Sequence, residues 1–241
     1  MISVRTKLYF SMENLILQQF FVFTFSERHD KMCSYLYFSF LRGQTMDSNF
    51  FALISRMRYI ARWGLMRNAL PENIQEHSHM VAVLAHALGV IRRDIFHQPC
   101  DVNALATAAL YHDASEILTG DLPTPIKYHN AEIMSAYHAV EDLAVQKLLG
   151  MLPPELRETY ADVLAEDKDG DIYPLVKAAD KLSAYIKCIE ERKAGNNEFL
   201  SAEAQTHAAL DASPLPEVQY FLEHFIPAFE RDLDELGAIG Q

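Results

Sequence analysis

The chain has 241 residues, of which half are hydrophobic and 22% are charged, and its formal net charge is −12. This composition supports a globular core and excludes global disorder, and the length suits one domain with an appendage better than two full domains. The acidic balance is a poor match to polymeric nucleic acid, so a small anionic substrate would need a local cation, most simply a metal ion. Three cysteines without a CxxC motif exclude a disulfide scaffold or a Cys-rich zinc site and favour a reducing, cytoplasmic location.

The composition changes near Met46. Residues 1–45 hold 7 of the 14 Phe and no Ala, and their charge is +2 (5 basic minus 3 acidic), whereas residues 46–241 hold 28 Ala and carry −14 (16 minus 30). The most apolar stretch, residues 15–25, is too short to span a bilayer. We therefore expect residues 1–45 to be a non-native or disordered extension and residues 46–241 to form the domain. A membrane-surface anchor in residues 1–45 is the alternative.

From Met46 onward, the apolar residues recur at helical spacing and no segment alternates with period 2. Turn and capping residues divide this pattern into expected helices over residues 50–61, 74–91, 102–117, 130–149, 154–164, 174–193, 198–212 and 216–236. Residues 119–125 contain a Gly and two Pro and are expected to form a loop, as is the acidic stretch 166–171. The predicted fold class is all-α, a single compact helical bundle.

Three polar residues stand at the end of the apolar pattern of residues 102–117. They are His112, Asp113 and Glu116, which one helical turn would present together. Burying a carboxylate among small apolar residues is unfavourable unless it is paired or binds a metal. A helix-end cluster of solvated polar groups is the alternative for this pattern taken alone.

Two further residues point to the same interior. His77 shares a helix stripe with Val81, Leu84 and Leu88 and is therefore expected to face inward. Asp180 stands in mid-helix among Ala and Leu, where Asp has poor helix propensity. Two His and two Asp (with His112 and Asp113) would suit a first-row divalent ion such as Mn²⁺, Co²⁺, Fe²⁺ or Zn²⁺.

The order His…His-Asp…Asp on Ala-rich helices resembles the HD-domain metal-dependent phosphohydrolases. Five segments resemble the bacterial 5′-deoxynucleotidase branch of that family: RWGLMRN at 62–68, EHS at 76–78, YHDASE at 111–116, TGDLPTP at 119–125 and AGNNEF at 194–199. The resemblance extends over about residues 48–236, and its most specific part is residues 111–125.

The resemblance implies the HD helical domain, a homodimer and hydrolysis of deoxyribonucleoside 5′-monophosphates with one divalent metal ion (Co²⁺, Mn²⁺ or a similar ion). It implies His77, His112, Asp113 and Asp180 as metal ligands. It implies Glu116 as the catalytic carboxylate. The substrate contacts that it implies, together with the metal-bound His77, Asp113 and Asp180, are Arg62, Trp63, Asp121, Leu122, Pro123 and Thr124.

These residue types suit the implied chemistry. Arg62 could hold phosphate oxygens in a planar fork and so assist catalysis, and Glu116 could orient or deprotonate the attacking water. Trp63, the only Trp, could form a rigid wall for the sugar or base, although a core plug at a helix end is its alternative. Other HD phosphohydrolases, acting on triphosphates, cyclic nucleotides or alarmones, and a non-catalytic nucleotide or metal sensor remain alternative functions. Neither a polymeric nucleic acid nor a membrane is an expected partner.

Overall fold

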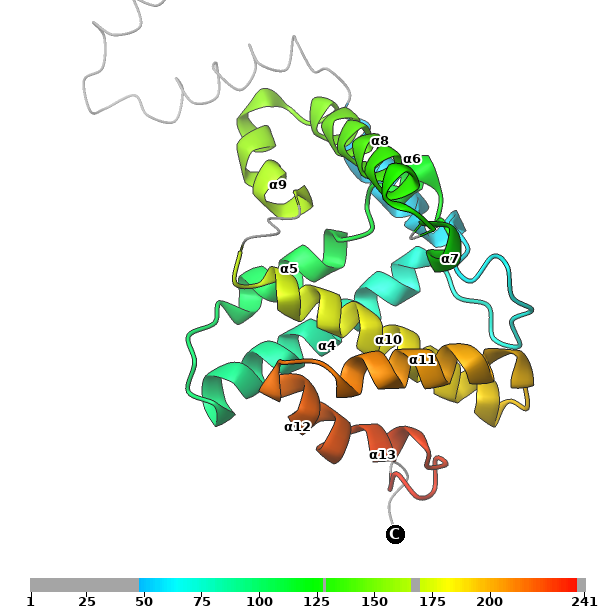
Figure 1. Ribbon diagram of the computed structural model, residues 1–241. Coiled ribbons are helices and arrows are strands. Elements are labelled where there is room, and N and C mark those ends of the chain that lie inside the picture. Colours follow the sequence, from blue (N-terminus) through cyan, green and yellow to red (C-terminus); the bar gives the residue numbers. More distant parts are fainter. Residues whose placement is uncertain (1–47, 128, 166–169, 238–241) are drawn as a thin grey trace, which may run out of the picture. The chain divides into compact units, whose positions relative to one another are not determined.

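The computed structural model describes residues 48–127, 129–165 and 170–237, which lie in the unit Ser48–Gln241 (Figure 1). The expected all-α fold is confirmed, because these residues contain helices and only one isolated bridge, between Ala61 and Asn73. The helical elements are α3 (Phe50–Ile54), the 3₁₀ helix η2 (Ser55–Tyr59), α4 (Ile74–Val90), the π-helical turn η3 (Ile91–Ile95), α5 (Val102–Tyr111), α6 (Glu116–Thr119), α7 (Thr124–Lys127), α8 (Ala131–Gly150), η4 (Pro154–Leu156), α9 (Arg157–Leu164), α10 (Tyr173–Lys193), η5 (Asn197–Phe199), α11 (Leu200–Asp211), α12 (Pro216–His224) and α13 (Ile226–Phe229).

The main core lies where α4 packs against both α5 and α10, while α11 packs against α10 (Figure 1). Leu84 and Leu88 of α4, Leu105 of α5 and Leu182 of α10 are among its buried side chains. Gly89 lets α5 approach closely, because a Cβ at this position would lie 2.9 Å from Leu105 Cδ2. This packing fixes the relative positions of the three elements that carry the predicted metal ligands.

A smaller hydrophobic cluster joins α3, α8 and α9. Phe50, Leu148 and Leu164 are buried in it together with Ala114, the residue after Asp113. The chain just beyond α5 is therefore also held by a second hydrophobic cluster.

The capping residues explain several helix starts. Asn73 accepts hydrogen bonds from the backbone N–H groups of Gln75 and Glu76 at the start of α4, and Asp101 and Asn130 cap α5 and α8 in the same way. These starts agree with the sequence-based expectations to within one residue.

Several expected helices are divided, and these boundaries were wrong. The helix expected over 154–164 begins as the 3₁₀ helix η4 and continues as α9. The helix expected over 50–61 becomes 3₁₀ at Ser55, whose hydroxyl donates back to the carbonyl of Ala52 at 2.8 Å. The helix expected over 216–236 breaks at Phe225, because Pro227 has no N–H to continue the helical hydrogen bonds. The loop expected over 119–125 ends early, since α7 begins at Thr124.

The division of one further expected helix matters most for the site. The helix expected over 102–117 ends at Tyr111, and a turn separates it from α6. The N–H of Ala114 donates to the carbonyl of Tyr111 at 2.9 Å, and the N–H of Glu116 donates to that of Asp113 at 3.0 Å. These i to i−3 bonds tighten the chain, so His112 and Asp113 stand on a turn rather than in mid-helix.

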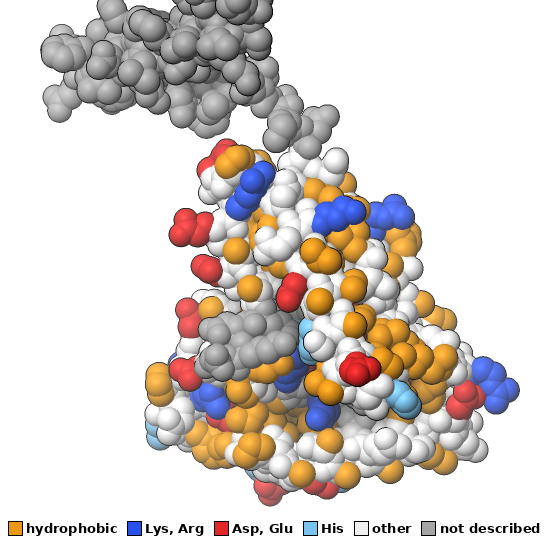
Figure 2. Space-filling view, turned by 45° about the horizontal axis from the view of Figure 1, so that its top comes forward, with side chains coloured by type: hydrophobic (Ala, Val, Ile, Leu, Met, Phe, Trp, Pro, Cys, Tyr) orange, Lys and Arg blue, Asp and Glu red, His pale blue; other side chains and the backbone are white. Residues whose placement is uncertain are grey.

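Within the described ranges, no helix combines the length and apolarity that crossing a membrane requires. The expected extension, residues 1–45, lies outside the described residues, as do four residues of the expected loop 166–171. Both expectations stay predictions. Figure 2 shows one face of the unit, on which acidic side chains are spread along one margin.

We predict that Leu182→Ala lowers the free energy of unfolding by about 2–5 kcal/mol, because it leaves a cavity between tightly packed helices. Urea denaturation followed by circular dichroism measures this change. Leu143→Ala is the control, since Leu143 is 69% exposed, and its effect should stay below about 0.5 kcal/mol. Equal losses in the two variants would contradict the assigned core.

Candidate metal centre

His77 enters the interior from the first turn of α4. Its side chain is 0% exposed, as its helix stripe predicts. Nδ1 lies 3.1 Å from Ser183 Oγ and 2.8 Å from Nη1 of Arg62. Arginine can only donate hydrogen bonds, so the Arg62 contact requires an unprotonated Nδ1. The hydroxyl of Ser183, in contrast, can accept a hydrogen bond from a protonated Nδ1. The Ser183 contact is therefore the one compatible with metal coordination through Nε2.

His112 has its tautomer set by the backbone. Nδ1 lies 2.7 Å from the carbonyl oxygen of Ala109, an acceptor only, so Nδ1 carries a proton and donates it. In the neutral ring, the lone pair is then on Nε2. The two imidazole rings of His77 and His112 lie 5.3 Å apart, centroid to centroid.

Two carboxylates face these imidazoles. His77 Nε2 lies 3.0 Å from Asp180 Oδ1 and 3.5 Å from Asp113 Oδ2, and His112 Nε2 lies 3.2 Å from the same Asp113 oxygen. One ligand atom each from His77, His112 and Asp180 lies within 4.8 Å of the others. The structure thus brings the four predicted ligands together from α4, the turn after α5, and α10.

The unsatisfied polar atoms of the site fit a bound cation. His77 Nε2 and His112 Nε2 are buried without a well-directed hydrogen bond, and so are Arg62 Nε and Glu116 Oε2. Buried polar atoms without a partner are rare in folded proteins, and here four of them gather in one place. The two nitrogens and two carboxylates form a mixed N/O ligand set of the kind that first-row divalent ions bind.

The two aspartates are held ionised. Burial raises the pKa of Asp113, but His112, His77 and Arg62 outweigh that effect and hold the pKa well below its usual range. Burial likewise opposes ionisation of Asp180, but the adjacent imidazole of His77 lowers the pKa of this carboxyl. Asp113 also raises the pKa of His112 against the effect of burial. A divalent cation would replace this dependence on imidazolium charge.

Glu116 begins α6 and is 6% exposed. Burial, followed by the charges of Asp113 and Asp121, raises the pKa of Glu116 to about 10. The carboxyl is therefore protonated at neutral pH in this arrangement. Neutralising Asp113 or Asp121 would lower the pKa of Glu116. The protonation of Glu116 is therefore coupled to the cation that Asp113 binds.

Arg62 and Trp63 are held by Glu72, a residue that sequence reasoning missed. Glu72 Oε2 accepts hydrogen bonds from Arg62 Nη1 at 2.7 Å and from Trp63 Nε1 at 2.9 Å. The N–H of Arg62 also donates to the carbonyl of Glu72 at 3.0 Å. Trp63 has a φ of +60°, a strained conformation for a non-glycine residue, and its ring lies 5.2 Å from that of Phe199. No local pattern marks Glu72, since the pairing depends on the bridge between Ala61 and Asn73.

Asp121, the first residue of the segment Asp121–Thr124, lies near the metal-ligand cluster. The charge of Asp121 acts on Arg62 and on Glu116. Burial and then Asp113 raise the pKa of Asp121 against the opposing effect of Arg62. Leu122 and Pro123 are half-buried, and Thr124 is exposed.

Among the described histidines outside the four-residue set, His138 and His207 each have an acidic neighbour. His138 has its Nδ1 2.9 Å from Oε2 of Glu141. Glu141 also accepts a hydrogen bond from Lys127. Lys127, His138 and Glu141 thus form a polar cluster between α7 and α8 that contains no member of the four-residue set.

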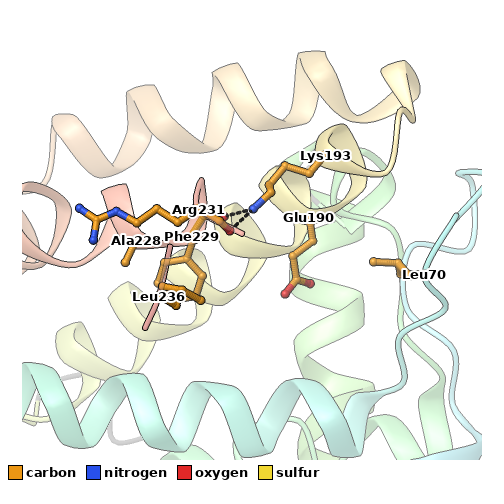
Figure 3. A pocket seen from close by; sticks show the side chains of 7 residues that line it. All are labelled: Leu70, Glu190, Lys193, Ala228, Phe229, Arg231 and Leu236. Atoms are coloured by element: carbon orange, nitrogen blue, oxygen red, sulfur yellow. Dashed lines mark hydrogen bonds between the residues drawn. The ribbon is translucent and has the colours of Figure 1, made fainter. Parts of the chain in front are cut away.

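An open hollow of about 580 Å³ lies elsewhere, at the C-terminal end of α10. It is lined by Leu70, Glu190, Lys193, Ala228, Phe229, Arg231 and Leu236 (Figure 3). Lys193 Nζ donates to the carbonyls of Phe229 and Arg231 at 2.8 and 2.7 Å. The hollow contains none of the predicted site residues, so the metal-ligand cluster is a separate feature.

Comparisons with known proteins identify the family of the chain. The family model described as 5′-deoxynucleotidase YfbR-like matches residues 49–229. The proteins named 5′-deoxynucleotidase YfbR from Shigella boydii serotype 18 and from Escherichia coli (strain K12 / DH10B) are each 50% identical over 192 residues, which cover 79% of this chain and 96% of theirs.

The fold has solved counterparts. An HD-domain phosphohydrolase from Listeria innocua superposes with a TM-score of 0.68 at 25% identity, covering 77% of this chain and 90% of that one. A protein from Pyrococcus horikoshii OT3 shares the fold with a TM-score of 0.58 at 21% identity, covering 76% and 98%. The chain belongs to the 5′-deoxynucleotidase YfbR-like family of HD-domain phosphohydrolases.

Proposed function

We propose that this chain is a metal-dependent 5′-deoxynucleotidase, which hydrolyses deoxyribonucleoside 5′-monophosphates to a deoxynucleoside and inorganic phosphate. Membership of the family supports the activity, since relatives that are 50% identical carry that name. The observation that carries the proposal is the pair of buried Nε2 atoms that lack a well-directed hydrogen bond and face two carboxylates beside the guanidinium of Arg62.

His77, His112, Asp113 and Asp180 would hold the divalent ion, either Co²⁺, Mn²⁺ or a similar first-row ion. When bound, such an ion polarises a phosphoryl oxygen and lowers the pKa of its water. A panel of divalent metals tests which ion supports the activity best. The substrate phosphate would lie on the open side of Asp180, whose side chain is 34% exposed.

Arg62 would bind the phosphate. Its Nε is buried and has no hydrogen-bond partner, while Nη1 is held by Glu72. A planar guanidinium with a free edge suits two phosphate oxygens. Trp63 beside it would form a wall for the sugar or base, and Asp121, Leu122, Pro123 and Thr124 would contact the sugar.

Glu116 would handle the proton of the attacking water. Its unpartnered Oε2 can accept a hydrogen bond from water once the carboxyl has lost its proton. As the water oxygen bonds to phosphorus, the bond from phosphorus to the 5′ oxygen breaks, and the proton passes to the leaving oxygen. Arg62 and the cation that the four ligands would hold would then stabilise the negative charge of the phosphoryl group.

A homodimer and a cytoplasmic location complete the proposal. The homodimer is implied by the family resemblance, and the cysteine usage of the chain supports a reducing, cytoplasmic compartment. Size-exclusion chromatography with light scattering tests the dimer.

We predict that the chain releases phosphate from deoxyribonucleoside monophosphates and that ribonucleotides, nucleoside triphosphates and cyclic nucleotides react far more slowly. The assay measures inorganic phosphate with Co²⁺, Mn²⁺ or Zn²⁺ added, and a chelator should abolish the signal. Preferred release from triphosphates or cyclic nucleotides would indicate another HD phosphohydrolase. Nucleotide binding without any release would indicate a sensor.

We predict that Glu116→Gln lowers kcat by about 10²- to 10⁴-fold while the variant keeps its metal, because glutamine retains the shape of the side chain but cannot take a proton. His112→Ala is the contrasting variant, which should lose both metal and activity. Elemental analysis of the purified proteins and phosphate release distinguish the two outcomes. Undiminished turnover in Glu116→Gln would remove Glu116 from the catalytic step.

A further inference from the structure

One stripe of α10 carries four polar side chains in a row. Asp180, Ser183, Lys187 and Glu191 follow one another at spacings of three, four and four residues, which places them on a single helix face. The first two lie at His77, in the metal-ligand cluster. The last two are buried further along the helix, with side-chain exposures of 4% and 0%.

Lys187 and Glu191 bind the backbone of the segment 64–71. Glu191 accepts hydrogen bonds from the N–H groups of Ala69 at 2.8 Å and Leu70 at 2.9 Å, and from Asn196 Nδ2 at 2.7 Å. Lys187 donates to the carbonyl of Leu70 and to Glu191. The ion pair therefore binds two backbone N–H donors, of Ala69 and Leu70, and one backbone acceptor, the carbonyl of Leu70.

The segment itself has little hydrophobic packing. Leu65 is 66% exposed and Leu70 is 48% exposed, and a Cβ at Gly64 would touch nothing within 4 Å. Burial of its own side chains thus contributes little to its position. The buried pair on α10 is what orders it.

The segment is the continuation of Arg62 and Trp63. Its other contacts come from the AGNNEF motif at 194–199, which the proposed mechanism does not use: Asn196 Nδ2 donates to the carbonyl of Arg67 at 2.7 Å, and Phe199 packs against the Trp63 ring. Glu198 pairs with Arg67 at 2.9 Å. The two motifs are therefore joined across the end of α10.

We propose that Lys187 and Glu191 are positioning residues that hold Arg62 and Trp63 in register with the metal-ligand cluster, and so determine the affinity for the nucleotide. The proposal rests on the proposed function of Arg62 and Trp63. The physical reason is that α10 carries both Asp180 and this ion pair, while the segment that the pair binds directly follows Arg62 and Trp63 in the chain. Neither side chain touches the substrate.

The test is Glu191→Gln. Glutamine keeps the length of the side chain but presents an amide N–H₂ where one carboxylate oxygen accepts two hydrogen bonds. We predict that kcat/KM for a deoxyribonucleoside monophosphate falls about 10²-fold, mainly through a higher KM. The metal content should stay equal to that of the unchanged protein.

Two readouts do not depend on activity. Trp63 is the only Trp of the chain, so its fluorescence emission should shift to longer wavelength when the segment is released. Amide hydrogen exchange of Ala69 and Leu70, followed by mass spectrometry of the peptide that contains them, should become faster. These readouts report on the segment even if the nucleotide proves to be the wrong substrate.

Glu203→Gln is the matched control. Glu203 lies on α11 and pairs with Arg192 of α10 at 2.9 Å, and it does not contact the segment. The substitution therefore removes a neighbouring ion pair of α10 without touching residues 64–71. We expect KM, fluorescence and exchange of residues 64–71 to stay unchanged in this variant.

Glu191→Gln leaves the Lys187 charge buried without its partner, which can unfold the chain. The double variant Lys187→Met with Glu191→Gln removes that charge and should recover thermal stability. If the pair only stabilises the fold, the double variant recovers KM as well. If the pair positions the segment, KM stays high and the exchange stays fast, because Ala69 and Leu70 still lack their anchor.

A low KM and protected amides in a folded Glu191→Gln or double variant would overturn the proposal. Absence of phosphate release by the unchanged protein would instead refute the proposed function, and the fluorescence and exchange results would then still decide whether the pair orders the segment.

Discussion

The site depends on one electrostatic constraint, which is that two buried imidazoles and two aspartates share a space only a few ångströms across. Their Nε2 and carboxylate oxygen atoms lie 3.0 to 3.5 Å apart, yet neither Nε2 makes a well-directed hydrogen bond. The helix packing that brings α4, α5 and α10 together determines this arrangement. Two carboxylates this close to each other repel unless a positive charge lies between them. A divalent ion supplies it at neutral pH and leaves the imidazoles neutral, as ligands must be.

The same helix links this constraint to the substrate. α10 contributes Asp180 to the cluster and, two to three turns later, the ion pair that grips the segment after Trp63. Glu72 then fixes both Arg62 and Trp63 through one carboxylate oxygen. The left-handed backbone of Trp63 is strained and persists because contacts on both sides hold it. The predicted metal ligands and the predicted phosphate contacts therefore belong to one connected framework. Fixed side-chain positions, rather than the closure of a mobile segment, set the geometry of the site.

Much of this could be predicted from sequence, because helical periodicity and capping residues are local signals. The stripe of His77 predicted its inward orientation, and Asp180 was marked by its poor fit to an apolar helix. The turn at His112 was missed, since an Ala-rich pattern continues through it and the break depends on the side chain of His112 bonding to the backbone. Glu72 and the Lys187–Glu191 pair were missed for a different reason. A Lys and a Glu four residues apart usually form a solvated surface pair. The Lys187–Glu191 pair is buried because residues 64–71 fold back over it.

The central claim is that the four side chains bind a single divalent ion. Anomalous diffraction from crystals of the full chain grown with Mn²⁺ or Co²⁺ tests it most directly. We expect one strong peak about 2 Å from Nε2 of His77 and of His112, with oxygen atoms of Asp113 and Asp180 completing the protein ligands. No peak at this position, or an ion held elsewhere while these four side chains stay paired with one another, would contradict the account.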